Sequence, residues 1–141
     1  MKKSREAGFS LIELIIVCAI IGIIASLAIP FLQKGIRAAE NGNTFATMRT
    51  ISSTQLRYYQ TNNRFGRLTE INNLMSNSLG TPSGSQLVRG KFTLAMDPDP
   101  NPTDGYLRDR YAITATRNVA GEGQTYIYKL DQSGQIVQLA P

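Results

Sequence analysis

A long run of apolar residues near the start of the chain dominates its hydrophobic pattern. Residues 9–33 carry a single charged side chain, that of Glu13. A helix rises about 1.5 Å per residue, so this run would extend roughly 38 Å, more than the ~30 Å hydrocarbon core of a bilayer. The pattern therefore predicts a membrane-spanning helix. Pro30 lies near its outer end and predicts a kink rather than a stop, because the helical pattern resumes beyond it.

The next segment, residues 34–61, alternates apolar and polar side chains at helical spacing. Larger side chains recur at steps of three and four residues, at Phe45, Met48, Ile51, Gln55, Tyr58 and Tyr59. This spacing predicts an amphipathic continuation of the helix with one face to bury. Asn41-Gly42-Asn43 are poor helix formers. We expect the long helix to bend or melt in an assembly at Pro30 and at this segment.

Residues 62–141 have the pattern of a small globular domain. Residues 68–74 predict a short helix with Thr69 as a possible N-cap, and the composition of residues 80–86 predicts a loop. Four runs then have strand-like alternation, at Lys91–Met96, Arg110–Arg117, Thr125–Leu130 and Gln135–Leu139. Turns are expected at residues 120–123 and 131–134. The fold class is therefore α+β, a long N-terminal helix packed against a small C-terminal antiparallel sheet of three or four strands.

The charge distribution gives little sign of a nucleic-acid-binding domain. The net charge is +5, and the excess in residues 34–61 comes from Lys34, Arg37, Arg49 and Arg57 against Glu40 alone. Residues 62–141 are nearly neutral, whereas DNA-binding domains usually carry a basic patch. DNA binding through residues 34–61 stays a possibility only if that surface is open to solvent.

The residue types available exclude several kinds of catalytic and metal site. The chain has no histidine, which excludes Ser-His-Asp and Cys-His catalysis and zinc sites that use histidine. Its single cysteine, Cys18, lies within the apolar run and excludes an intrachain disulfide. The bulky residue before Cys18 argues against lipidation, so we interpret it as a small apolar side chain. We expect neither an enzyme nor a cofactor.

One acidic segment resembles the start of a calcium-binding loop. Asp97, Asp99 and Asp104 lie close together in the sequence, partly at alternate positions. The EF-hand pattern fails, because Pro102 replaces the required glycine and Arg108 stands where the bidentate glutamate belongs. We therefore interpret the segment as a proline-rich surface loop and expect no metal there, with the three aspartates as weak candidate ligands.

The charge of Glu13 separates two interpretations of the N-terminal segment. An ordinary secretory signal could be cleaved after the small residues of Ser26-Leu27-Ala28. However, a carboxylate inside an apolar segment costs about 2.5–3.5 kcal/mol on insertion scales. A segment that is simply removed has no reason to keep such a residue.

The sequence from Gly8 to Val17, GFSLIELIIV, closely resembles the N-terminal signature of type IV prepilins and type II secretion pseudopilins. The resemblance covers residues 3 to about 32. It implies that a prepilin peptidase removes a leader of residues 1–8 by cutting between Gly8 and Phe9, and then N-methylates Phe9. It also makes Glu13 the fifth residue of the mature chain and Pro30 the kink proline.

Cleavage would place a cationic amine near the carboxylate of Glu13. A carboxylate in an apolar environment needs a cationic partner, or it neutralises. Glu13 could approach the Phe9 amine of its own helix or that of a neighbouring subunit. The resemblance favours the neighbour, which would fix the axial register of a filament.

The resemblance implies a structural role for the chain. We expect a pilin, a subunit of a type IV pilus-like helical filament, that assembles through its N-terminal helix with inner-membrane assembly machinery. Before assembly it would span the inner membrane once, and afterwards it would lie in an extracellular filament. The alternatives are a type II secretion pseudopilin and a DNA-uptake pilin. The major pseudopilin of the family carries calcium-site and tryptophan motifs near its C-terminus, and this chain has no tryptophan.

Overall fold

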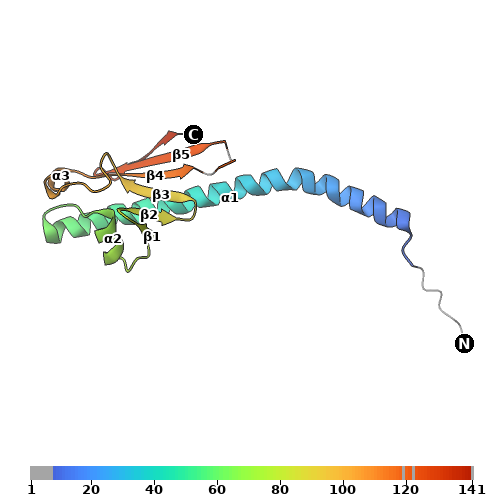
Figure 1. Ribbon diagram of the computed structural model, residues 1–141, viewed down its shortest axis with the longest axis horizontal. Coiled ribbons are helices and arrows are strands. Elements are labelled where there is room, and N and C mark those ends of the chain that lie inside the picture. The colour runs from blue at the N-terminus through green and yellow to red at the C-terminus, as the bar shows by residue number, and fades with distance from the viewer. Residues whose placement is uncertain (1–7, 119, 122, 141) are drawn as a thin grey trace, which may run out of the picture. The chain divides into compact units, whose positions relative to one another are not determined.

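The computed structural model describes residues 8–118, 120–121 and 123–140. The chain divides between Ala39 and Glu40 into two compact units. One helix, α1 (Leu11–Asn62), contributes to both (Figure 1). The helix continues through Pro30 and through Asn41-Gly42-Asn43. The prediction that the helix would not end at Pro30 is confirmed. Bending or melting of the helix in an assembly stays a prediction.

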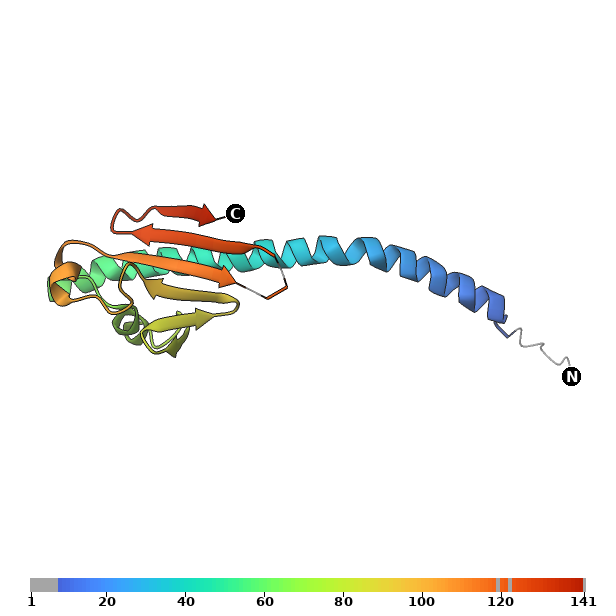
Figure 2. The same ribbon diagram turned by 45° about the horizontal axis from the view of Figure 1, so that its top comes forward.

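The second unit contains an antiparallel sheet of six strands. They are β1 (Thr81–Ser83), β2 (Gln86–Arg89), β3 (Phe92–Met96), β4 (Ala112–Asn118), β5 (Thr125–Asp131) and β6 (Ile136–Ala140). Their order in the sheet is their order in the sequence. The sheet lies alongside the C-terminal part of α1 in both ribbon views (Figures 1 and 2). The predicted α+β layout of a long helix and an antiparallel sheet is confirmed.

The predicted number of strands was wrong, because β1 and β2 were missed. The four strand-like runs correspond to β3, β4, β5 and β6. The loop predicted at residues 80–86 instead contains β1 and the start of β2. Strand β1 has three exposed residues and includes a proline, so it shows no apolar alternation. A tight turn joins it to β2 at Gly84, whose φ of 62° suits glycine.

The core forms where the amphipathic part of α1 meets the sheet. Met48 and Ile51 are fully buried on the helix, as predicted, whereas Tyr59 of the predicted face is exposed. The Phe45 ring lies 4.6 Å from the ring of Tyr128 on β5. The sheet contributes buried apolar side chains, including Leu87, Phe92, Leu94, Ile113, Ala115 and Leu130. Burying each large apolar side chain stabilises the unit by about 1.5–3 kcal/mol.

One polar residue of the predicted buried face fixes the chain after α1. Gln55 is fully buried. Its Nε2 donates to the carbonyl oxygen of Gly66 at 2.8 Å, and its Oε1 accepts from the Gly66 N–H at 2.7 Å. Both polar ends of the amide are therefore satisfied, which removes most of the cost of burying it. The pair fixes the loop between α1 and α2.

Two short helices complete the unit, and the sequence predicted one of them. Helix α2 (Leu68–Leu74) has the predicted bounds. The prediction of Thr69 as its N-cap was wrong, because the cap is Arg67, whose backbone N–H donates to Glu70 Oε2 at 2.8 Å. Helix α3 (Asp104–Asp109) was not predicted and begins at the end of the proline-rich segment.

The turns were predicted more successfully than the first hairpin. The turn at residues 131–134 is confirmed, since it joins β5 to β6 and the Gly134 N–H donates to the Asp131 carbonyl oxygen at 3.0 Å. Ala120 and Gly121 form a turn between β4 and β5. The remainder of the turn predicted at residues 120–123 includes Glu122, which lies outside the described residues.

An ion pair joins α1 to the sheet at the start of the second unit. The side chain of Arg117 on β4 is fully buried, and its Nη2 lies 2.9 Å from Glu40 Oε2. Lys91, in the turn before β3, lies 3.9 Å from Glu40 Oε1 and is more exposed. These contacts attach the helix to β4 and to the β2–β3 turn at the point where the folded unit begins.

Candidate assembly site

The N-terminal end of α1 is closed by a reciprocal pair of hydrogen bonds. Gly8, Phe9 and Ser10 precede the helix, which begins at Leu11. The Ser10 N–H donates to Glu13 Oε2 at 2.9 Å, and the Glu13 N–H donates to Ser10 Oγ at 3.3 Å. This arrangement is a capping box, which satisfies two helix donors that otherwise lack partners. The carboxylate also lies in the first turn, where the helix dipole favours a negative charge.

Sequence reasoning singled out Glu13 and missed the role of Ser10. The signal was nevertheless present, because a serine followed three residues later by glutamate before an apolar run is the usual pattern of a capping box. The structure places Gly8 and Phe9, the residues of the expected cleavage site, directly before this cap. Both are exposed.

The first part of α1 presents an apolar surface on every side. Its large apolar side chains are between 43% and 76% exposed from Leu11 to Ile36. Among the described residues, α1 is the one helix long and apolar enough to cross a membrane. Pro30 and Cys18 both lie in this part, and Cys18 is exposed. A soluble monomer rarely leaves so large an apolar surface uncovered, so this surface must be covered by lipid or by protein.

The three candidate calcium ligands have other partners. Asp97 Oδ2 lies 2.6 Å from Lys129 Nζ, and Asp104 Oδ1 lies 2.8 Å from Arg67 Nη2. Asp99 accepts a hydrogen bond from the Asn101 N–H at 2.9 Å. The part of the chain that the structure describes has no group of three or more metal-ligating side chains. The fold therefore does not bring these aspartates together as a ligand set.

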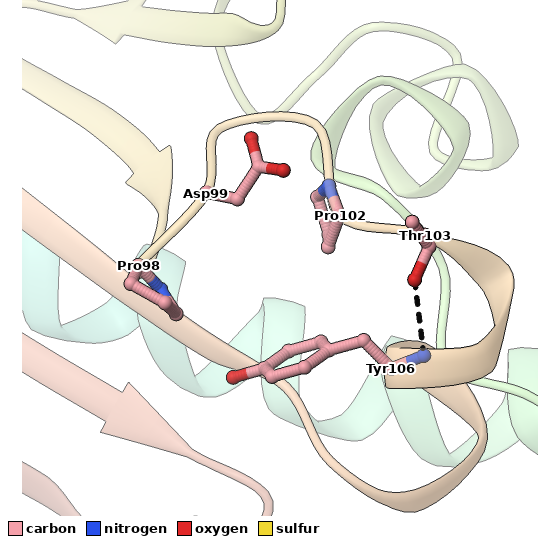
Figure 3. A pocket seen from close by; sticks show the side chains of 5 residues that line it. All are labelled: Pro98, Asp99, Pro102, Thr103 and Tyr106. Atoms are coloured by element: carbon pink, nitrogen blue, oxygen red, sulfur yellow. Dashed lines mark hydrogen bonds between the residues drawn. The ribbon is translucent and has the colours of Figure 1, made fainter.

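The proline-rich segment instead borders a shallow pocket of about 140 Å³. It is lined by Pro98, Asp99, Pro102, Thr103 and Tyr106 (Figure 3). The Thr103 hydroxyl accepts from the Tyr106 N–H at 3.4 Å and caps α3. The Tyr106 hydroxyl donates to the Asp97 carbonyl oxygen at 3.3 Å. These bonds hold the segment against α3, and its polar groups serve the loop itself.

The basic residues between positions 34 and 61 remain a separate surface feature. Lys34, Arg49 and Arg57 are exposed, and Arg37 is half-buried. Glu40, the acidic residue among them, is paired with Arg117 and Lys91. Whether this surface stays open in a filament decides whether DNA could reach it, so DNA uptake stays a prediction.

Comparison with known proteins extends the similarity from the N-terminal motif to the rest of the chain. A family described as "Prokaryotic N-terminal methylation motif" matches residues 3–29. A fimbrial protein of Moraxella nonliquefaciens is 31% identical over 139 residues, which cover 95% of this chain and 84% of the relative. The chain belongs to the type IV pilin and pseudopilin family. The resemblance inferred from residues 8–17 is thereby confirmed.

Two other relatives of this pilin-family chain carry the name of a secretion component. The type II secretion system core protein G of Pectobacterium carotovorum subsp. carotovorum is 28% identical over 104 residues. The match covers 74% of this chain and 58% of that protein. The core protein G of Aeromonas hydrophila is 26% identical over 101 residues, covering 71% of each chain. No solved structure matches the chain.

Family membership identifies the chain as a structural protein. Pilins and pseudopilins are non-enzymatic subunits that a prepilin peptidase processes and that assemble into filaments. The N-terminal motif and the uncovered apolar helix are together those of a subunit that is inserted into a membrane before it assembles. The exposed part of α1 is therefore the candidate assembly site.

Proposed function

We propose that this chain is a pilin, the structural subunit of a type IV pilus-like extracellular filament. The observation that carries the proposal is the exposed apolar surface of α1 from Leu11 to Ile36, whose charged side chains are Glu13 near its start and Lys34 near its end. Lipid covers this surface before assembly, when the chain spans the inner membrane once. The helices of neighbouring subunits cover it afterwards.

Processing prepares the N-terminus for this assembly. A prepilin peptidase removes residues 1–8 and methylates the amine of Phe9. Glu13 lies one turn along the helix, and it pairs with the Phe9 amine of a neighbouring subunit. Because both charges would be costly alone in an apolar core, the pair allows one axial register and disfavours others. Pro30 lets the helix deform between its neighbours.

A pseudopilin of a type II secretion system is the second candidate, supported by the two core protein G relatives. Two observations favour the pilus. The match to the fimbrial relative covers 95% of this chain, whereas the matches to the two core protein G relatives cover 74% and 71% of it. In addition, Asp97 and Asp104 each pair with a cationic side chain, which differs from the calcium site of the family's major pseudopilin.

Intact-mass spectrometry and electron microscopy of sheared surface material test the proposal. We expect a chain of residues 9–141 carrying one additional methyl group, in fibres many subunits long. Gly8→Val should block processing and leave the chain in the membrane. A mature chain beginning at Ile29 would indicate ordinary signal-peptidase cleavage and would contradict the prepilin interpretation. Correct processing without long fibres would favour the pseudopilin.

Glu13→Ala tests the charge pair directly. Its apolar segment should insert into the membrane at least as well as wild type, because a charge has been removed. Filament yield should fall, because the Phe9 amine of the neighbour loses its partner, at a cost of about 3–5 kcal/mol for a buried pair. Glu13→Gln keeps the shape and loses the charge, so it should also be defective.

The measurement compares membrane-bound and sheared fractions for each variant expressed without wild-type subunit, after processing has been confirmed by mass. Normal filament yield from Glu13→Ala would show that apolar packing alone builds the fibre.

A further inference from the structure

The capping box uses one of the two carboxylate oxygens of Glu13. Oε2 accepts the Ser10 N–H, while Oε1 accepts no hydrogen bond from any residue that the structure describes. Both bonds of the box join Ser10 and Glu13 and involve none of residues 1–8. Removal of the leader would therefore keep the cap intact and expose a new amine one residue before it.

We propose that Ser10 is a positioning residue for subunit assembly. Its hydroxyl fixes the first turn of α1 so that Glu13 holds its own backbone with Oε2 and presents Oε1 to the Phe9 amine of a neighbouring subunit. This inference rests on the proposed function, and it adds a residue to which neither the motif nor the relatives assign a role.

The Ser10 side chain is needed because the site lies at the edge of an apolar segment. The Glu13 N–H is one of the first-turn donors that have no intrahelical acceptor, and little water reaches such a group in hydrocarbon. With Ser10 Oγ as its acceptor, the turn stays closed. Without it, the turn frays, and the carboxylate loses the backbone donor that orients it.

The orientation matters because helical side chains lean toward the helix N-terminus. Glu13 is thus directed at the end of the helix where a neighbouring amine must arrive. A group held in its bound orientation loses less conformational freedom on pairing, and so it binds more tightly. Ser10 consequently acts on assembly through Glu13 and makes no contact with the partner in this scheme.

A matched pair of variants isolates the hydroxyl. Ser10→Thr keeps an acceptor at this position, whereas Ser10→Val has nearly the same shape and lacks it. We expect both full-length chains to be processed at the same site, as intact mass will report. Sheared filament yield should be close to wild type for Ser10→Thr and about three- to tenfold lower for Ser10→Val, in line with typical losses from removing an N-cap. If Ser10→Val impairs processing, Ser10→Ala replaces it.

Repeating the comparison in chains that carry Glu13→Ala shows whether the Ser10 hydroxyl acts on assembly through Glu13 or only through the stability of the helix. Tagged variants also carrying Glu13→Ala are allowed to co-assemble with wild-type subunits, so that incorporation can be measured. If Ser10 acts through Glu13, the difference between Ser10→Thr and Ser10→Val should disappear in this background. A difference of unchanged size between these double variants would overturn the proposal. Equal filament yields from Ser10→Thr and Ser10→Val chains that keep Glu13 would also overturn it.

Amide exchange provides a measurement that does not depend on filaments. In processed chains held in detergent micelles, the Glu13 amide should exchange several-fold faster in Ser10→Val than in Ser10→Thr. Equal exchange in the two variants overturns the capping role. If processed wild-type chains form no filaments, the proposed function fails and the assembly role of Ser10 fails with it, while the exchange result still reports whether the cap exists.

Discussion

At the scale of single residues, the Glu70 carboxylate shows how this small unit stabilises itself without a disulfide. It accepts hydrogen bonds from Arg64 Nη1 and Nη2 at 2.9 and 2.7 Å, and from the Arg67 N–H at 2.8 Å. The Arg64 hydrogen bonds, helped by the Arg67 N–H, lower the pKa of Glu70 from 4.5 to about 2 despite partial burial. The same pairing raises the pKa of Arg64.

This shift makes stability depend on pH in an acidic window. A carboxyl with a lowered pKa in the folded state contributes stability above its unfolded pKa and loses it as the pH falls toward the folded value. Glu70→Gln should therefore lower the free energy of unfolding at pH 7 by about 1–2 kcal/mol, allowing for screening of a partly exposed pair. The deficit should shrink between pH 4.5 and 2. Urea unfolding of micelle-held protein, followed by tyrosine circular dichroism, measures it. An equal deficit at pH 7 and pH 2 would contradict the assignment.

At the scale of elements, α1 is attached to the sheet around the segment that the sequence marks as weak. Glu40 pairs with the buried Arg117 of β4. Asn43 Oδ1 accepts a long hydrogen bond from Arg89 Nη2 of β2 at 3.5 Å. These contacts link Asn41-Gly42-Asn43 to the sheet at both ends of the segment. Of the two expected sites of bending, Pro30 is the less constrained.

Glu40→Gln tests this attachment. Removing the charge that faces a buried guanidinium should destabilise the start of the folded unit by about 2 kcal/mol, less than for a fully buried pair because Glu40 is partly exposed. Amides of residues 40–47 should then exchange roughly 30-fold faster, as hydrogen-exchange mass spectrometry can measure. Lys91→Gln is the matched control, since its contact is longer and more exposed, and its effect should be small. Unchanged exchange in Glu40→Gln would show that packing alone holds the segment.

The elements that sequence reasoning found are those whose side chains alternate between core and solvent. Met48 and Ile51 on α1, and Ile113 and Ala115 on β4, are buried as the pattern predicts. Strand β1 was missed because backbone pairing to β2 holds it while its side chains stay exposed. Helix α3 was missed because six residues after a proline-rich segment show too little periodicity.

In the candidate site, too, the residues that could be predicted were those with a visible sequence pattern. Glu13 was identified because a charge in an apolar run is conspicuous and fits a family signature. Ser10 was overlooked because its role depends on a hydrogen bond to the side chain of another residue. The partners of Asp97 and Asp104 could not be predicted either, since Lys129 and Arg67 are distant in the sequence.

At the scale of the whole molecule, the two units differ in how their apolar residues are used. All the fully buried apolar side chains of the described residues lie in the unit that begins at Glu40. The preceding part of α1 has apolar side chains without a core to join. Assembly should therefore bury this part and leave the packing of the second unit unchanged.

Cys18 provides a probe of that burial. As the single cysteine, exposed on the apolar part of α1, it should react with a small maleimide in subunits held in detergent micelles. In assembled filaments its labelling should be at least tenfold slower, because neighbouring helices exclude the reagent. Filaments dissociated in detergent and labelled afterwards serve as the control. Equal rates before and after dissociation would show that this helix face stays open in the fibre.

The strand order has a consequence for how the exported part of the chain acquires its structure. Every strand pairs only with its neighbours in the sequence, so each ladder closes a short loop, and local pairing of this kind favours fast folding. A chain held by its N-terminal helix while the rest emerges would receive its strands in the order in which they pair. The connection from β3 to β4, residues 97–111, is longer than the others and contains α3. The β3–β4 ladder therefore closes the longest of these loops, at a modest additional cost in chain entropy.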